Sequence, residues 1–208
     1  MTAKVRNLVK APLRERVNAE EWEARVNLAA CYRLAAHFRM TDLIYAHISA
    51  RVPGPEHHFL INAFGQLWDE IGASTLVKVT LDGDIVEDPT GYGFNRAGYV
   101  IHSAVHRARP DVACVMHTHT AAGIAVSAQE DGLLPISQHA MRFTMYYLER
   151  ACQTQVTAMA GGARLRIPAP AVAEKTAAQF SALPYKPKRP EWKALLRMLD
   201  KMDPSYKN

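Results

Sequence analysis

The sequence predicts a single α/β domain, and three observations lead to that fold class. A capping residue followed by apolar positions at three- and four-residue spacing predicts a long first helix near the start. Short runs rich in Ile, Val, Leu and Phe, separated by Pro, Gly and Asp, then predict a group of strands. With 208 residues and 49% hydrophobic content, the chain has enough material for one sizeable core.

The first helix is expected to begin after Asn18 and to end near Arg39. The Asn18 side chain is a suitable cap, and the acidic residues Glu20 and Glu21 lie at the positive end of the helix dipole. Residues 1–17 are expected to form a flexible leader. The residues expected on the inward face of the helix are Trp22, Val26, Ala29, Ala30, Arg33, Leu34 and His37.

Three strands are expected next, at residues 43–51, 57–62 and 76–81. Turn residues separate them, and the turn at residues 82–84 is expected to close a hairpin onto Ile85 and Val86. A second helix should begin after Asn95 and end before Pro110, because proline disfavours helical conformation in the preceding residue. A buried strand at residues 112–119 follows.

Only helices are expected after that strand, at residues 120–128, 143–160, 171–180 and 191–202. We assign residues 18–183 to the main domain and residues 184–208 to a linker and a C-terminal helix. A final run of helices without a strand is unusual, because the sheet of an α/β domain must be covered on its faces and protected at both edges.

Composition narrows the classes of function. The net charge is +5, but basic and acidic residues are mixed along the chain except at its two basic ends, so no nucleic-acid-binding stripe is indicated. Three scattered cysteines suggest neither a disulfide framework nor a thiolate zinc site, and a reducing compartment is the simplest interpretation. No segment is apolar enough to span a membrane, so we expect a cytoplasmic protein. The basic segment at residues 2–14 leaves an organelle-targeting peptide as an alternative.

The clearest chemical signal is the pair His117 and His119. Because side chains alternate along a strand, both imidazoles should project to the same face and bind one divalent metal at the end of the strand. Catalytic zinc normally takes three protein ligands and leaves one position open. The pair is therefore half a metal site, or else two polar residues that finish a strand.

Other histidines are candidates for a third ligand. His102 and His106 lie four residues apart on the second helix and share one face with Gly98, one turn earlier. An acid at position 98 would approach the metal, but glycine supplies no proton acceptor. The alternative for His102 is a buried histidine with a structural role. His139 is a further candidate ligand, although nothing in its spacing requires that role.

Five ordered motifs then resemble those of the class II aldolase/adducin family. The resemblance covers roughly residues 20 to 143. The motifs that carry it are Tyr45-Ala46-His47-Ile48-Ser49-Ala50-Arg51, Phe59-Leu60-Ile61-Asn62-Ala63-Phe64-Gly65, Asn95-Arg96-Ala97-Gly98-Tyr99-Val100-Ile101-His102, Arg109-Pro110-Asp111 and Val115-Met116-His117-Thr118-His119-Thr120. The motifs at Ala46 and Asn95 look closer to the adducin-like bacterial branch than to sugar-phosphate aldolases.

The resemblance implies a three-layer αβα domain around a largely antiparallel sheet, often assembled as a tetramer. It also implies a zinc or similar ion bound by three histidines, with a glutamate as acid and base. His117 and His119 match the first two ligands. The third should precede the helix that begins near Tyr146, but Phe143-Thr144-Met145 joins the flanking motifs directly. A segment of several dozen residues with that ligand and some strands is therefore expected to be missing, which leaves the sheet incomplete.

The resemblance also places other site residues. The glutamate of the aldolases falls at Gly98, and their phosphate-binding asparagine falls at His47. Gly65 is retained beside Phe64, and Arg96 and Ala97 stand where the aldolases have two serines. We expect His47, Gly65 and Arg96 to line a substrate site that does not hold phosphate as the aldolases do. Arg96 would instead pair with a carboxylate.

Three functions follow from this comparison. The first is a catalytically impaired, lyase-like protein with residual metal ligands. The second is an adducin-head-like module for binding or assembly, with self-association or actin filaments as partners by family analogy. The third is an active metal-dependent lyase, acting on a small hydroxy-carbonyl or carboxylate substrate, that recruits His102 or His139. An incomplete sheet would also leave an unpaired strand edge, which favours self-association.

Overall fold

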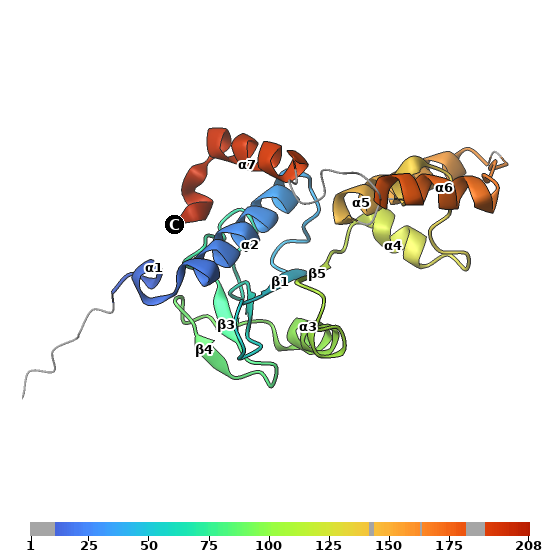
Figure 1. Ribbon diagram of the computed structural model, residues 1–208. Coiled ribbons are helices and arrows are strands. Elements are labelled where there is room, and N and C mark those ends of the chain that lie inside the picture. Colours follow the sequence, from blue (N-terminus) through green and yellow to red (C-terminus); the bar gives the residue numbers. More distant parts are fainter. Residues whose placement is uncertain (1–10, 142–143, 163, 182–189) are drawn as a thin grey trace, which may run out of the picture.

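The protein is built around a five-stranded sheet in which every strand pair is antiparallel. The computed structural model describes residues 11–141, 144–162, 164–181 and 190–208. The strands are β1 (His47–Arg51), β2 (Phe59–Ile61), β3 (Val77–Val79), β4 (Ile85–Glu87) and β5 (Cys114–His117), in the order β4-β3-β2-β1-β5. The α/β fold class with an antiparallel sheet is confirmed, and β5 forms one end of the sheet (Figure 1).

Helix α2 (Ala19–His37) covers one face of the sheet. Its Asn18 cap is as predicted, since the side chain accepts a hydrogen bond from the Glu21 amide at 2.7 Å. The predicted inward face was only half right, because α2 is buried on two sides. Leu28, Tyr32 and Ala35 pack into the main core against β1 and β2. Ala29, Ala30 and Leu34 instead face the C-terminal segment, while Trp22 stays half-buried and His37 is exposed.

Helix α3 (Arg96–Ala108) lies on the opposite face. Side chains alternate along β1, so Ile48 points to α2 whereas Ser49 points to α3, where it contacts His102 and His106. Tyr99 of α3 stacks on Phe59 of β2 with ring centroids 5.8 Å apart. The layers are therefore helix, sheet, helix, as the resemblance implied.

The last helices before the C-terminal segment form an arm that extends away from the sheet (Figure 1). It consists of α4 (Ala121–Ser127), the 3₁₀ helix η1 (Gln138–Met141), α5 (Met145–Ala160) and α6 (Pro170–Ser181). Two residues at the start of α5 connect it to the body: Met145 packs against the main core, and the Tyr146 ring lies 4.9 Å from that of Phe38.

The two ends of the described chain are both packed on the body. A short helix, α1 (Leu13–Arg16), buries Leu13 within the stretch predicted to be a flexible leader. At the other end, α7 (Pro190–Met202) and the 3₁₀ helix η3 (Pro204–Lys207) pack on α2, with Leu199 and Tyr206 buried. The predicted linker around residues 184–189 lies outside the described residues.

The strands are shorter than predicted, for a local reason in two cases. Ala46 and His57 have φ values of 71° and 55°, so the extended conformation begins only after each of them. The strand predicted at residues 112–119 is ordered as β5 only over Cys114–His117. Across the described part of the chain, no helix combines the length and apolar character needed to cross a membrane.

Candidate metal centre

His47 is the first residue of β1, and its side chain packs tightly against α3. Its side chain is 5% exposed, and neither ring nitrogen has a hydrogen-bond partner among the described residues. A Cβ added to Gly98 would lie 2.8 Å from His47 Nε2 and closer still to Nδ1 and Cε1. The imidazole therefore fills the space that a side chain at position 98 would enter.

A second buried group links β1 to α3. The Ser49 hydroxyl lies 2.7 Å from His102 Nδ1 and 2.8 Å from His106 Nε2. It can donate to one ring and accept from the other, which holds both histidines against the sheet. Burial lowers the pKa of His102 to about 3 and that of His106 to about 4, so both imidazoles are neutral at physiological pH.

His117 and His119 lie together, as the alternation along β5 predicted. Their ring centroids are 4.6 Å apart, and His117 pairs directly with His47 across β1 and β5. His119 Nδ1 lies 2.8 Å from a carboxylate oxygen of Asp42. A carboxylate on one ring nitrogen is the usual support for a histidine that binds metal through the other. Asp42 was not predicted, because nothing in the sequence indicates a contact across 77 positions.

The donor set is nevertheless incomplete. Among the described residues, no three histidine, cysteine, aspartate or glutamate side chains are arranged to hold a metal ion. His102 uses Nδ1 to contact Ser49, and His139 lies in η1, where it stacks on Tyr147 at 5.6 Å. The residues present thus fit half of a three-histidine centre but not a complete one within one chain.

Of the three predicted substrate residues, His47 lies beside His117, whereas Arg96 makes its described contacts elsewhere. The guanidinium of Arg96 donates to the Gly83 carbonyl at 2.9 Å and lies over the Phe94 ring, so it fastens the β3–β4 turn to α3. Gly65 has φ of 92°, a conformation that favours glycine, and a Cβ there would meet open space. Their substrate role remains a prediction.

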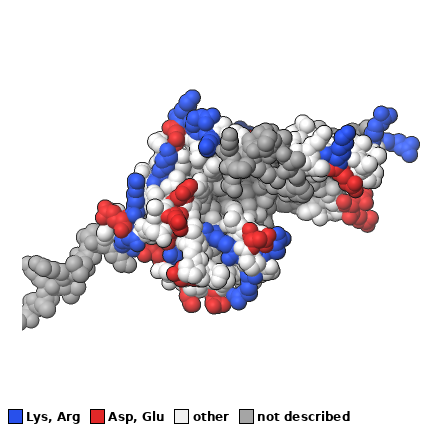
Figure 2. Space-filling view, viewed as in Figure 1, with Lys and Arg blue, Asp and Glu red and all other residues white. Residues whose placement is uncertain are grey.

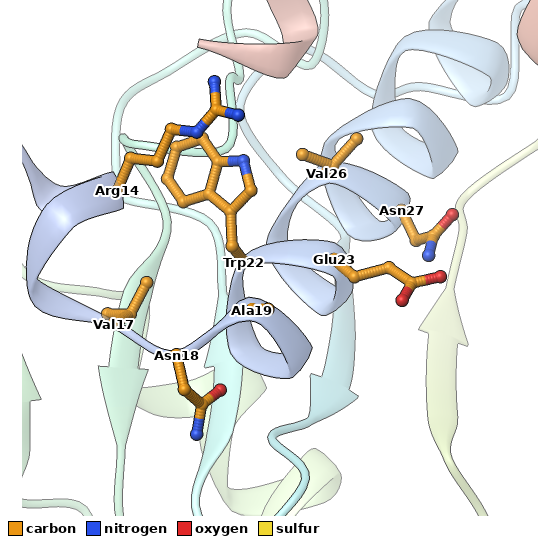
Figure 3. Close-up of a pocket in the computed structure, with 8 residues that line it drawn as sticks. All are labelled: Arg14, Val17, Asn18, Ala19, Trp22, Glu23, Val26 and Asn27. Atoms are coloured by element: carbon orange, nitrogen blue, oxygen red, sulfur yellow. The ribbon is translucent and has the colours of Figure 1, made fainter.

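A groove of about 580 Å³ lies elsewhere, between α1 and the first turns of α2. Figure 3 shows the Arg14 side chain beside the Trp22 ring, with the guanidinium 5.8 Å from the ring centroid. None of its lining residues belongs to the predicted site: Arg14, Val17, Asn18, Ala19, Trp22, Glu23, Val26 and Asn27. On the face of the molecule in Figure 2, basic and acidic side chains are interspersed.

This arrangement agrees with comparisons to known proteins. Residues 26–181 match the model of the family described as class II aldolase and adducin N-terminal domain. Because that match covers most of the chain, the protein belongs to the class II aldolase/adducin family.

Bacterial relatives include a Caulobacter vibrioides protein provisionally named an aldolase class 2 protein. It is 56% identical over 129 residues, which are 62% of this chain and 50% of that protein. Mouse α-adducin is 55% identical over 118 residues, 56% of this chain but 16% of the adducin. The matched region thus spans half or less of these two relatives.

A Pseudomonas aeruginosa protein, also provisionally named an aldolase class 2 protein, aligns along 95% of this chain and 96% of its own length with 41% identity. That alignment is 252 residues long, whereas this chain has 208 residues in all. At least 44 aligned positions, the difference between those two lengths, therefore have no counterpart here. This agrees with the predicted internal deletion.

Solved structures support the fold. The crystal structure of an aldolase II superfamily protein from Pseudomonas syringae has a TM-score of 0.88 and 44% identity, and covers 95% of this chain and 100% of that one. L-fuculose 1-phosphate aldolase from Glaciozyma antarctica has a TM-score of 0.77 over 91% of this chain and 94% of its own, at 20% identity. The second likeness concerns the fold alone.

Proposed function

We propose that this protein is a catalytically disabled, lyase-like member of its family that retains half of the metal site. The observation that carries the proposal is the packing of His47 on Gly98. In the aldolases that the sequence resembles, the residue at position 98 supplies the acid and base, and its side chain must reach the substrate. Here the imidazole of His47 occupies that space, and a Cβ on residue 98 would collide with it.

The ligand set supports the same conclusion. In an intact aldolase, three histidines would hold a metal that supplies positive charge to the substrate oxygens, and a carboxylate would move the proton. This chain offers His117 and His119, with Asp42 behind His119, and no third group among the described residues. Its own residues can position a cation weakly, but they supply neither the proton acceptor nor a complete centre.

The test is an activity measurement on the full chain after incubation with zinc. Retro-aldol cleavage of L-fuculose 1-phosphate and of unphosphorylated hydroxy-carbonyl compounds should not exceed that of a His117→Ala/His119→Ala variant. Folding of both proteins is checked by circular dichroism. Turnover that is present in the natural chain and absent from the double variant would establish an active lyase instead, and loss of that turnover in His102→Ala or His139→Ala would identify the recruited ligand.

A second candidate is an adducin-head-like module for binding or assembly. The observation that favours it is the 55% identity with mouse α-adducin over 118 residues, which are 56% of this chain. Co-sedimentation with actin filaments tests the analogy. Saturable binding that persists in the His117→Ala/His119→Ala variant would support a module whose histidines are remnants, and absence of binding would remove actin as the partner.

A further inference from the structure

We propose that the half site is completed by a second copy of this chain, so that one zinc ion joins two β5 strands through four histidines. The inference rests on the half site of the proposed function. Zinc in structural sites is almost always bound by four ligands in a tetrahedral arrangement. One chain supplies two imidazoles at the end of an open strand edge, and a second copy would bring a matching pair.

The edge of β5 lacks the features that normally protect a sheet edge. Such edges are commonly blunted by charged residues, proline or a bulge. The opposite edge strand, β4, has these features: its register with β3 shifts at Lys78 and Val79, and Glu87 is followed by Asp88 and Pro89. In contrast, Cys114–His117 contains no Asp, Glu, Lys, Arg or Pro, and the described residues pair it only with β1.

The hydrogen-bonding direction of β5 can be inferred from one contact. The Ala113 carbonyl accepts a hydrogen bond from the Arg51 amide of β1 at 2.9 Å. Because these directions alternate along a strand, the backbone groups of residues 115 and 117 also face β1. Those of Cys114 and Met116 therefore point to the open edge, where another strand can pair with them. Thr118 follows the end of β5, and its backbone groups would point the same way in a strand extended by that pairing.

A two-fold axis beside Thr118 brings the four histidines together. Antiparallel pairing of two copies about that residue sets His117 of one copy opposite His119 of the other, and the reverse. Residues directly opposite in an antiparallel pair share a face, and in the non-hydrogen-bonded pairs their Cα atoms are about 4.5 Å apart. All four imidazoles would then lie on the same face, within reach of one ion.

The details of His119 suit this role. Its side chain is about one-third exposed, and Asp42 holds Nδ1, so Nε2 remains for a metal. The His117 ring lies beside that of His119, with the two ring centroids 4.6 Å apart. The residues of the longer relatives that this chain lacks would explain why it has an open edge and a missing ligand together.

The experiment is light scattering with size-exclusion chromatography on the full chain, in a reducing buffer because Cys114 is exposed. Zinc chloride is titrated in, and the same samples are analysed for bound metal. We expect the mass to double with one zinc per two chains and to return to that of one chain with EDTA. His119→Ala, which removes two of the four ligands, should abolish both the dimer and the bound zinc. His139→Ala should retain both.

Three results would overturn the proposal: a monomer that binds one zinc per chain, a chain that binds no zinc, or a dimer unaffected by EDTA and by His119→Ala. Loss of zinc in His139→Ala would place the third ligand inside one chain and would also overturn it. Thr118→Pro removes the outward amide at the axis and should weaken the zinc-dependent dimer. The outcome is independent of activity, so it can fail while the protein remains catalytically disabled.

Discussion

His47 and Gly98 lie 51 positions apart in the sequence and pack directly against each other. The imidazole is buried without a hydrogen-bond partner for either nitrogen among the described residues, which normally costs about 1–3 kcal/mol per unsatisfied group. Its pKa is lowered to about 4 by burial and by the neighbouring His117 and His119. The absence of a side chain at position 98 is what makes room for this ring, so the two positions are expected to be coupled energetically.

The coupling can be measured with a double-mutant cycle. Glycine to alanine inside a helix ordinarily stabilises by up to about 1 kcal/mol. Here Gly98→Ala should destabilise the protein by about 1–3 kcal/mol, because the new Cβ collides with His47. In a His47→Asn background the same change should be neutral or stabilising. Urea denaturation of the four proteins gives the coupling free energy, and equal effects of Gly98→Ala in both backgrounds would refute the packing argument.

Because His102 and His106 are buried around Ser49, we expect the protein to lose stability in mild acid. The pKa values of His102 and His106 are about 3 and 4 in the folded protein and about 6.5 when unfolded. Below pH 6.5 the unfolded chain takes up protons that the folded chain does not. The contribution of these two histidines to the free energy of unfolding is therefore fully present above pH 6.5. It is lost as the pH falls toward 4, by up to about 1.4 kcal/mol per pH unit for each histidine.

Chemical denaturation at pH 7.5 and 5.5 measures this effect. His102→Gln should remove about one proton from the pH dependence, whereas the control Tyr92→Ala, which removes an exposed side chain and no histidine, should leave it unchanged. A pH dependence that is the same in both variants would show that His102 titrates normally in the folded protein.

At the scale of elements, the sequence predicted the features that depend on neighbouring residues, such as the helix caps. Asn18 and Asn95 cap α2 and α3 as expected, because a capping side chain acts within three residues. Contacts between distant segments could not be predicted. Ser49 meets His102 and His106 across more than 50 positions, and the 3₁₀ helix at the C-terminus docks on α2 without a sequence pattern that identifies its partner.

The C-terminal 3₁₀ helix η3 contributes to the core through Tyr206. Tyr206 is fully buried against Ala29, Ala30 and Leu34, and its carbonyl accepts from the Ala73 amide at 3.0 Å. Tyr206→Ala should destabilise the protein by about 3 kcal/mol, since it removes a large buried side chain. Tyr92→Ala, at a position that is 67% exposed, is the control and should change stability by less than about 0.5 kcal/mol. Similar midpoints for both variants in urea would show that η3 does not contribute to the core.

At the scale of the whole molecule, the body and the arm are stabilised by different kinds of contact. The body has an apolar core that joins α2 to the sheet, including Leu28, Tyr32, Ile48 and Trp68. In the arm, fully or nearly buried positions on α5 are partly polar: Gln155 bonds to Gln129, Gly132 and Leu134, and Glu149 accepts from Thr120. Polar groups that are well paired specify a geometry but add less stability than apolar burial.

The arm should therefore open more readily than the body. Its link to the core is short, through Met145 and Tyr146, and regions with few buried apolar contacts exchange amide hydrogens by local opening. In native-state hydrogen exchange we expect amides of α5 and α6 to exchange well before those in the middle of α2. Tyr146→Ala should widen that difference, because it removes the contact with Phe38, whereas Tyr92→Ala should not. If α5 and α2 exchanged with equal free energies of opening, the arm and the sheet would unfold as one cooperative unit.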